Sequence, residues 1–100
     1  MFSKSLFIKQ NNKNCVFKSP DGKVLTGTVI IPANESPSGS EIIIRLNDMG
    51  LLHSENMPAV ETIGHIEFWK NGALHRENHL PAVCTAGFKI KEYWENGKKV

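Results

Sequence analysis

The residues of this sequence best suited to chemistry lie in its second half, and they are four histidines and a cysteine: His53, His65, His75, His79 and Cys84. His75 and His79 are four residues apart, a spacing that aligns two metal ligands on a helix. A metal site needs three or four convergent ligands, and a Cys84–His79 nucleophile pair needs a third group that orients the base. The surrounding pattern is that of strands and turns. A metal site around His75, His79 and Cys84 is therefore kept only as a minor alternative.

Two of the histidines have a structural explanation. His53 precedes Glu55 by two residues, and His75 precedes Glu77 by two. Residues two apart on a strand share a face, so each pair can form a hydrogen bond. We favour this structural role, and we expect neither a metal nor a cofactor.

The sequence contains no motif of a common catalytic class. It lacks a phosphate-binding loop, a dinucleotide-binding glycine pattern, a nucleophile elbow and a zinc-protease helix. Cys15 and Cys84 are too few for a disulfide framework, and neither lies in a C-x-x-C spacing. We expect both to be small apolar residues in a reducing compartment, and we expect the protein not to be an enzyme.

A tandem repeat must position these residues: residues 50–71 form one unit and residues 72–100 the next. Both units contain, in order, Gly, Leu, His, Glu, Asn, Pro, Ala, Val, Thr, Gly, Glu, an aromatic residue, Trp and Asn. The second unit has one residue inserted before its proline and two more after Gly87. The sequence therefore predicts a repeated architecture.

The content of the repeat is β-structure. Asn-Gly between apolar segments favours a type I′ hairpin turn, because both central residues of that turn have positive φ. Asn71-Gly72 is expected to fold strand 65–70 back onto 73–76, and Asn96-Gly97 to fold 88–95 onto the last three residues. The units should then join as an antiparallel meander.

Alternation along the strands predicts which residues share a face. In the first unit Ile66 and Phe68 share one face, and His65, Glu67 and Trp69 share the other. In the second unit, Ile90, Glu92 and Trp94 fall together, opposite three other residues: Lys89, Lys91 and Tyr93. The positions of Ile66 and Ile90 agree only if the insertion forms a bulge or a longer turn.

The motif Glu-aromatic-Trp-x-Asn-Gly, followed by Leu-His-Arg-Glu and Pro-Ala-Val, resembles tandem repeats of bacterial and phage proteins. These are akin to MORN-type repeats and to those of the YwqK-like family, whose members are often labelled antitoxins. The resemblance covers residues 50–100 and implies a β-hairpin array used as an interaction scaffold. Met57 and Leu80 depart from the pattern, since a Gly often precedes the proline there.

The first half, residues 1–49, reads as β-structure without a clear repeat. We expect strands at 6–10, 15–18, 23–31 and 41–46, with a type I turn at Ser19-Pro20-Asp21-Gly22. The last of these strands has a continuous apolar run, which predicts burial on both faces. The segment before Gly50 is interpreted as a decayed repeat unit. With 100 residues, the whole chain is expected to form one all-β domain of eight to ten strands.

Composition and charge exclude few classes of function. The chain has 12 basic and 10 acidic residues, and the basic excess lies at the N-terminus, where five lysines face one acidic residue: Lys4, Lys9, Lys13, Lys18 and Lys23. Lysines spread evenly along the chain usually lie on the solvent-facing side of a sheet. A phosphate-binding role is the alternative. The longest apolar run is far below the roughly 20 residues of a membrane-spanning helix. We expect a cytoplasmic protein without membrane contact.

Taken together, the sequence favours a small non-enzymatic module that binds another protein. It would act as a stoichiometric inhibitor, antitoxin-like or of the phage anti-defence type, by steric occlusion. We expect the contact residues to be Trp69, Trp94, Tyr93 and Arg76, because Trp, Tyr and Arg dominate interface energetics. The alternative is a nucleic-acid-binding β module that uses the N-terminal lysines. A homodimer through the C-terminal edge strand is a further hypothesis.

Overall fold

The computed structural model describes residues 4–7, 16–36 and 39–100. Within them the one helical element is a 3-10 turn, η2 (Ala33–Glu35), and the rest is strands and turns. The strands are β1 (Gly27–Ile31), β2 (Ile42–Leu46), β3 (Val60–Thr62), β4 (His65–Glu67), β5 (Trp69–Lys70), β6 (Ala73–Leu74), β7 (Val83–Thr85), β8 (Ile90–Glu92), β9 (Trp94–Glu95) and β10 (Lys98–Lys99). The prediction of a small all-β domain is confirmed.

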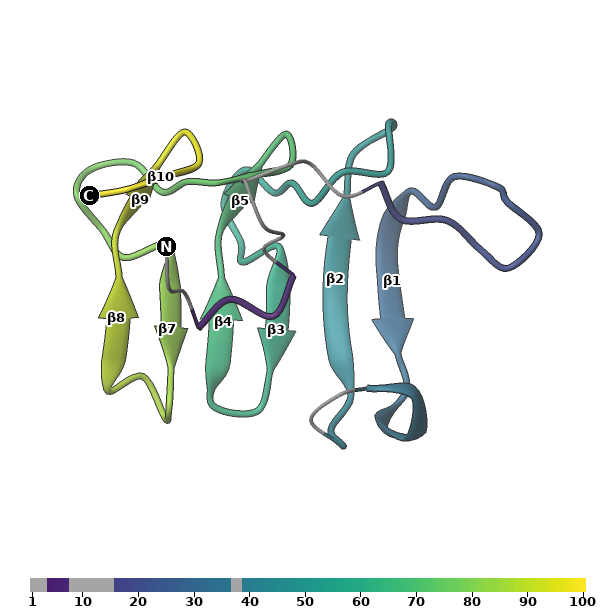
Figure 1. Cartoon of the computed structure of the whole chain (residues 1–100), viewed down its shortest axis with the longest axis horizontal. Coiled ribbons are helices and arrows are strands. Elements are labelled where there is room, and N and C mark those ends of the chain that lie inside the picture. The colour runs from purple at the N-terminus through teal and green to yellow at the C-terminus, as the bar shows by residue number, and fades with distance from the viewer. Residues whose placement is uncertain (1–3, 8–15, 37–38) are drawn as a thin grey trace.

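Six strands form one antiparallel sheet in the order β1-β2-β3-β4-β7-β8 (Figure 1). The strands β5 and β6 leave this sheet and form a hairpin of their own, so that β4 pairs with β7. The strands β9 and β10 form the corresponding hairpin after β8. Each repeat thus contributes two strands to the sheet, and a hairpin beside the sheet follows each pair, the first of them spanning the boundary between the two repeats.

The Asn-Gly turns fold as predicted. Asn71 and Gly72 have φ values of 48° and 81°, and Asn96 and Gly97 have values of 51° and 80°. Two positive φ angles in succession define a type I′ turn, which matches the twist of the flanking strands. Lys70 pairs with Ala73 across the first of these turns.

The two-residue insertion of the second repeat forms a longer turn. In the first repeat Thr62 pairs with His65, so two residues connect β3 to β4. In the second repeat Thr85 pairs with Ile90, so four residues connect β7 to β8. Glu92 is thereby placed like Glu67, and Ile90 occupies the position of His65. This removes the conflict between the two face assignments.

Backbone hydrogen bonds extend the repeat to the segment before Gly50. The amide of Phe68 donates to Ala82 O at 2.7 Å, and the amide of Arg45 donates to Ala59 O at 2.8 Å. The three hairpins are closed in the same way. The amide of His53 donates to Arg45 O at 3.0 Å, that of His75 to Phe68 O at 3.1 Å, and that of Val100 to Tyr93 O at 2.9 Å. This shared pattern supports the interpretation of the segment as a decayed repeat unit.

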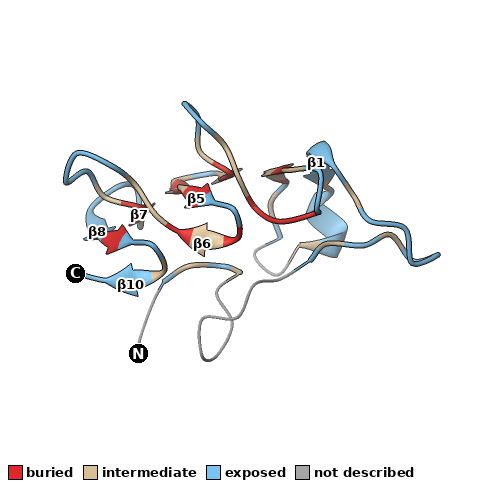
Figure 2. Cartoon of the chain, turned by 90° about the horizontal axis from the view of Figure 1, so that it is seen from above, coloured by how far each residue is buried: buried red, intermediate tan, exposed pale blue. Residues whose placement is uncertain are grey.

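The core lies between the sheet and the hairpins, where buried residues meet (Figure 2). Its members come from every unit: Ile42, Ile44, Leu46, Leu52, Ala59, Val60, Trp69, Leu74, Ala82, Val83 and Trp94. The prediction that strand 41–46 is buried on both faces is wrong. Burial alternates along β2, because only one face of the sheet is covered by hairpins, and Ile43 and Arg45 are partly exposed.

The first half is less regular than expected. The long strand predicted for 23–31 begins only at Gly27, and an isolated bridge joins Lys18 to Val24. The turn at 19–22 is confirmed by the Gly22 amide, which donates to Ser19 O at 2.9 Å. The strand predicted for 6–10 and the start of that predicted for 15–18 fall partly outside the described residues. Leu6 itself is not in a strand.

Candidate functional site

The first repeat contains a fully buried carboxylate. Glu67 is 0% exposed, and its carboxylate accepts hydrogen bonds from two groups of its own strand face. The indole N–H of Trp69 donates to Oε1 at 2.8 Å, and His65 Nε2 lies 2.6 Å from Oε2. Alternation places all three side chains on one face, as the sequence predicted, and in the structure this is the covered face. The buried charge is therefore held by donors, which burial of a carboxylate requires.

The second repeat buries an equivalent carboxylate. Glu92 Oε1 accepts the indole N–H of Trp94 at 3.1 Å. Because Ile90 takes the place of His65, no histidine stands two residues before Glu92. The Glu-x-Trp pair of each repeat is thus one structural unit: the carboxylate orients the indole, and the indole fills the core.

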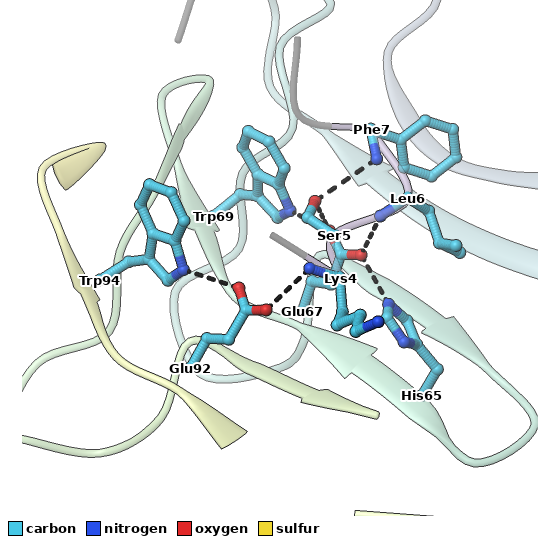
Figure 3. A network of polar contacts seen from close by, with 9 residues as sticks. All are labelled: Lys4, Ser5, Leu6, Phe7, His65, Glu67, Trp69, Glu92 and Trp94. Carbon is cyan, nitrogen blue, oxygen red and sulfur yellow. Dashed lines mark hydrogen bonds and ion pairs between the residues drawn. The ribbon is translucent and has the colours of Figure 1, made fainter. Parts of the chain in front are cut away.

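A segment far away in sequence completes both carboxylate sites (Figure 3). The amide of Leu6 donates to Glu67 Oε2 at 2.6 Å, and the Ser5 hydroxyl donates to Glu67 Oε1 at 2.7 Å. The amide of Lys4 donates to Glu92 Oε2 at 2.7 Å. In Figure 1 this segment crosses β4, the strand that carries Glu67. Two neighbouring repeats therefore bind amides two residues apart on one segment.

The tryptophans do not lie on the surface. Trp69 is 6% exposed and Trp94 is 1% exposed, so the expectation that they contact a partner directly conflicts with their burial. The physical reason is the carboxylate beneath each indole, which satisfies the polar N–H inside the core. In each repeat the adjacent aromatic residue points the other way: Phe68 is partly exposed and Tyr93 is exposed.

Two histidines connect the start of each repeat to its end. The amide of Asn71 donates to His53 Nδ1 at 3.0 Å, and the amide of Asn96 donates to His75 Nδ1 at 2.9 Å. The other ring nitrogen of His53 faces Glu55 at 3.0 Å, and that of His75 lies 3.8 Å from its partner carboxylate. The hydrogen bond expected within each His-Glu pair forms between His53 and Glu55, whereas His75 and Glu77 lie beyond hydrogen-bond distance. Each imidazole anchors the Asn-Gly turn at the end of its repeat.

The three residues of the alternative metal site each have different neighbours. His75 is engaged by the Asn96 amide, Cys84 is buried within β7, and His79 is exposed beside Glu95, 3.9 Å away. Among residues 4–7, 16–36 and 39–100, no group of three His, Cys, Asp or Glu side chains is placed to hold a metal ion.

A solvent-open pocket of about 280 Å³ lies beside the last hairpin. It brings together three of the four residues that the sequence singled out, with four others: Arg76, His79, Leu80, Tyr93, Trp94, Glu95 and Val100. Its rim presents three exposed apolar side chains, Leu80, Tyr93 and Val100 at 45%, 39% and 71%, beside the exposed His79 and Glu95. Trp94 forms part of the wall although almost none of it reaches solvent.

A pocket of about 370 Å³ occupies the equivalent place one repeat earlier. Phe68, Trp69 and His75 line it where Tyr93, Trp94 and Val100 line the other. Most of its remaining lining is polar: Ser54, Glu55, Asn56, Lys70, Arg76, Glu77 and Asn78, with Leu80. The repeat therefore generates one pocket per unit, and the last one is the more apolar.

Arg76 stands between the two pockets. Its guanidinium lies 3.8 Å from the centroid of the Phe68 ring, and its Nη1 donates to Pro81 O at 3.2 Å. The cation–π contact fixes a long side chain that would otherwise be mobile. The Arg76 side chain is thus held in one position and separates the two pockets.

The lysine stripe is described only in part. Lys9 and Lys13 lie outside the described residues, and the other three are exposed: Lys4, Lys18 and Lys23. The phosphate-binding alternative therefore stays a prediction. As the helical part of the described residues is the three-residue η2, no helix there has the length and apolar character to cross a membrane.

Sequence reasoning missed the buried carboxylates and the segment that covers them. The recurrence of Glu two residues before Trp was the available signal, since the two share a strand face and a donor faces an acceptor. The contact of residues 4–6 with Glu67 and Glu92 had no such signal, because it joins residues more than 60 positions apart.

The comparisons with known proteins assign no relative: no family model matches the chain, and neither does any curated protein or solved structure.

Proposed function

We propose that this protein is a non-enzymatic protein-binding module of the cytoplasm, and that its contact surface is the pocket beside the last hairpin. The observation that carries the proposal is the apolar rim of that pocket, with Leu80, Tyr93 and Val100 exposed together. An aromatic anchor site with a polar surround is typical of protein interfaces. Arg76 forms a preorganised wall, which lowers the entropy cost of binding.

The neighbouring sheet edge supports the same surface. The strand β8 is one of the two outer strands of the six-stranded sheet, and Phe88 just before it and Ile90 at its start are about half exposed. An outer strand has backbone donors and acceptors with which a partner segment can pair. A partner that pairs with β8 and inserts an apolar side chain beside Tyr93 would be held by both features. Inhibition then needs no chemistry, because a rigid array on a partner's active surface excludes other ligands.

The test is a matched pair of variants. Tyr93→Ala removes the aromatic rim, whereas Ile63→Ala removes an apolar side chain that is 84% exposed in the turn between β3 and β4, away from the pocket. Both variants and the wild type are used to capture partners from extracts of the source organism. We expect a partner that binds the wild type and Ile63→Ala at a fixed stoichiometry and is lost with Tyr93→Ala. Recovery of the same partners with both variants would contradict the proposal.

Salt dependence separates the nucleic-acid alternative from this proposal. Binding to phosphates weakens steeply with salt because it releases counterions. An apolar pocket contact should change little between low and high salt. Tight binding of single-stranded nucleic acid that is lost at high salt and unaffected by Tyr93→Ala would favour the lysine surface.

The homodimer stays part of the proposal as a concentration-dependent state. Two copies paired through β8 would bury the rims of both pockets. Sedimentation that finds only monomers at high concentration would remove the dimer and leave the pocket free for another protein.

A further inference from the structure

The segment that covers the buried carboxylates is bound mainly through its backbone. Glu67 and Glu92 each accept one amide, from Leu6 and Lys4, and these amides are two residues apart. The segment bends at Leu6 and Phe7, where the Phe7 amide donates to the Ser5 hydroxyl oxygen at 3.4 Å, and the amides of Lys4 and Leu6 are each taken by one of the two neighbouring repeats. The side chain that adds a polar contact is Ser5, through its hydroxyl.

The end of the segment is held by apolar contacts. Phe7 packs against the core cluster, and its ring meets that of Phe17 edge to face at a centroid separation of 5.3 Å. Residues 4–7 therefore present four features in order: an amide, a hydroxyl, a second amide and an aromatic ring. All these contacts are non-covalent, so a segment of another chain with the same four features could make them.

The carboxylates need donors from whatever covers them. Glu67 is completely buried with four donors around it, two at each oxygen, and two of the four come from Ser5 and Leu6. A buried carboxylate that loses its donors costs several kcal/mol. An apolar surface could not replace the segment, whereas any peptide with the same pattern of donors could.

We infer that the surface formed by Glu67, Glu92 and the adjoining core is a peptide-binding site, which residues 4–7 fill as a resident ligand. Its ligand class is a short peptide with two amides two residues apart, a Ser or Thr between them and an aromatic residue after the second. A partner's segment of this chemistry binds by displacing residues 4–7, so the resident segment acts as a competitive plug. This site shares Trp94 with the pocket of the proposed function but is bound through different groups, so each can fail without the other.

The test uses full-length variants in which the plug is weakened. Leu6→Pro removes the amide that Glu67 accepts, and Ser5→Gly removes the hydroxyl and makes the unbound segment more flexible. The probe is the peptide acetyl-Lys-Ser-Leu-Phe-amide. The indole N–H signals of Trp69 and Trp94 in NMR spectra are the readout, because each indole donates to one of the two carboxylates.

We expect the peptide to shift both indole signals, with affinity rising from wild type to Ser5→Gly to Leu6→Pro. N-methylation of the peptide at Leu should weaken binding at least about tenfold, the value of one hydrogen bond to a charged group. Ile63→Ala should bind the peptide like the wild type.

Two results would overturn the inference. One is a peptide that binds all the variants with equal affinity, since the plug would then not compete for its site. The other is an N-methylated peptide that binds as well as the unmodified one. Should Leu6→Pro fail to fold, the Ser5→Gly protein and the pair of peptides decide the matter.

Discussion

The two repeats hold the same Glu-x-Trp pair in different surroundings. In the first repeat Glu67 has His65 two residues before it, Trp69 two residues after it, and the segment 5–6 above it. In the second, the four-residue turn places Ile90 where the histidine would stand, and Lys4 donates to Glu92. The comparison teaches that the repeat conserves an acceptor beneath an indole, whereas the remaining donors are supplied by whatever lies nearby.

The largest expected effect separates these two carboxylates. In Glu67→Gln an amide NH₂ replaces one oxygen and faces two donors, so about 3–5 kcal/mol of stability should be lost. In Glu92→Gln the indole and the Lys4 amide each meet a different oxygen, and we expect about 1–3 kcal/mol. Urea unfolding of both variants measures the difference. Equal losses would show that His65 and Ser5 add nothing to the first site.

The next effect compares two equivalent glycines, Gly50 and Gly97. Both have positive φ, 74° and 80°, so alanine is strained at either by about 1–2 kcal/mol. At Gly50 a Cβ would also lie 2.7 Å from Val24 Cγ1 and 3.2 Å from two carbonyl oxygens. At Gly97 the nearest atom is Ala73 Cβ at 3.5 Å, an ordinary contact.

Gly50→Ala should therefore cost about 2–4 kcal/mol in total, and Gly97→Ala about 1–2 kcal/mol. Thermal unfolding followed by circular dichroism gives both values. The excess at Gly50 measures how tightly the first half of the chain covers the start of the array. If the two losses were the same, that cover would be loose.

The third effect concerns the histidines that connect the start of each repeat to the Asn at its end. His53→Ala and His75→Ala each remove an acceptor from an Asn amide, with an expected loss of about 1–2 kcal/mol. The loss should be larger at His53, whose second nitrogen is closer to its carboxylate. Asparagine at either position retains an acceptor near that of Nδ1 and should recover part of the loss. An asparagine variant no more stable than the alanine variant would exclude the hydrogen bond as the cause.

The repeated part of the fold was predictable because its signals are local. The Asn-Gly pairs define the hairpins, and strict alternation placed Glu67 and Trp69 on one face. Alternation does not say which face is covered, so the burial of Trp69 and Trp94 was not foreseen. The partial exposure of Ile43 had the same cause, since the apolar run of β2 gives no sign that hairpins cover one side.

The candidate sites were less predictable than the fold. Arg76 and Tyr93 reach one pocket because the repeat stacks their strands, and the sequence had grouped them by residue type. The binding of residues 4–6 to Glu67 and Glu92 depends on the path of the chain through space. No local pattern encodes that path, and only the three-dimensional structure reveals it.

The smallest expected effect lies outside the repeat, in the turn at residues 19–22, and provides the baseline for the others. The Ser19 hydroxyl and then the Lys23 amide donate to Asp21 and hold the pKa of its carboxyl below the usual value. A lowered folded-state pKa contributes stability above the unfolded-state value of about 3.9, and this contribution is lost as the pH falls through the folded-state pKa. The stability difference between wild type and Asp21→Asn should therefore shrink between about pH 5 and pH 2. A constant difference would mean that the turn is held by its backbone alone. Because Asp21 is exposed, the change should be far smaller than that of Glu67→Gln, whose carboxylate is buried among four donors.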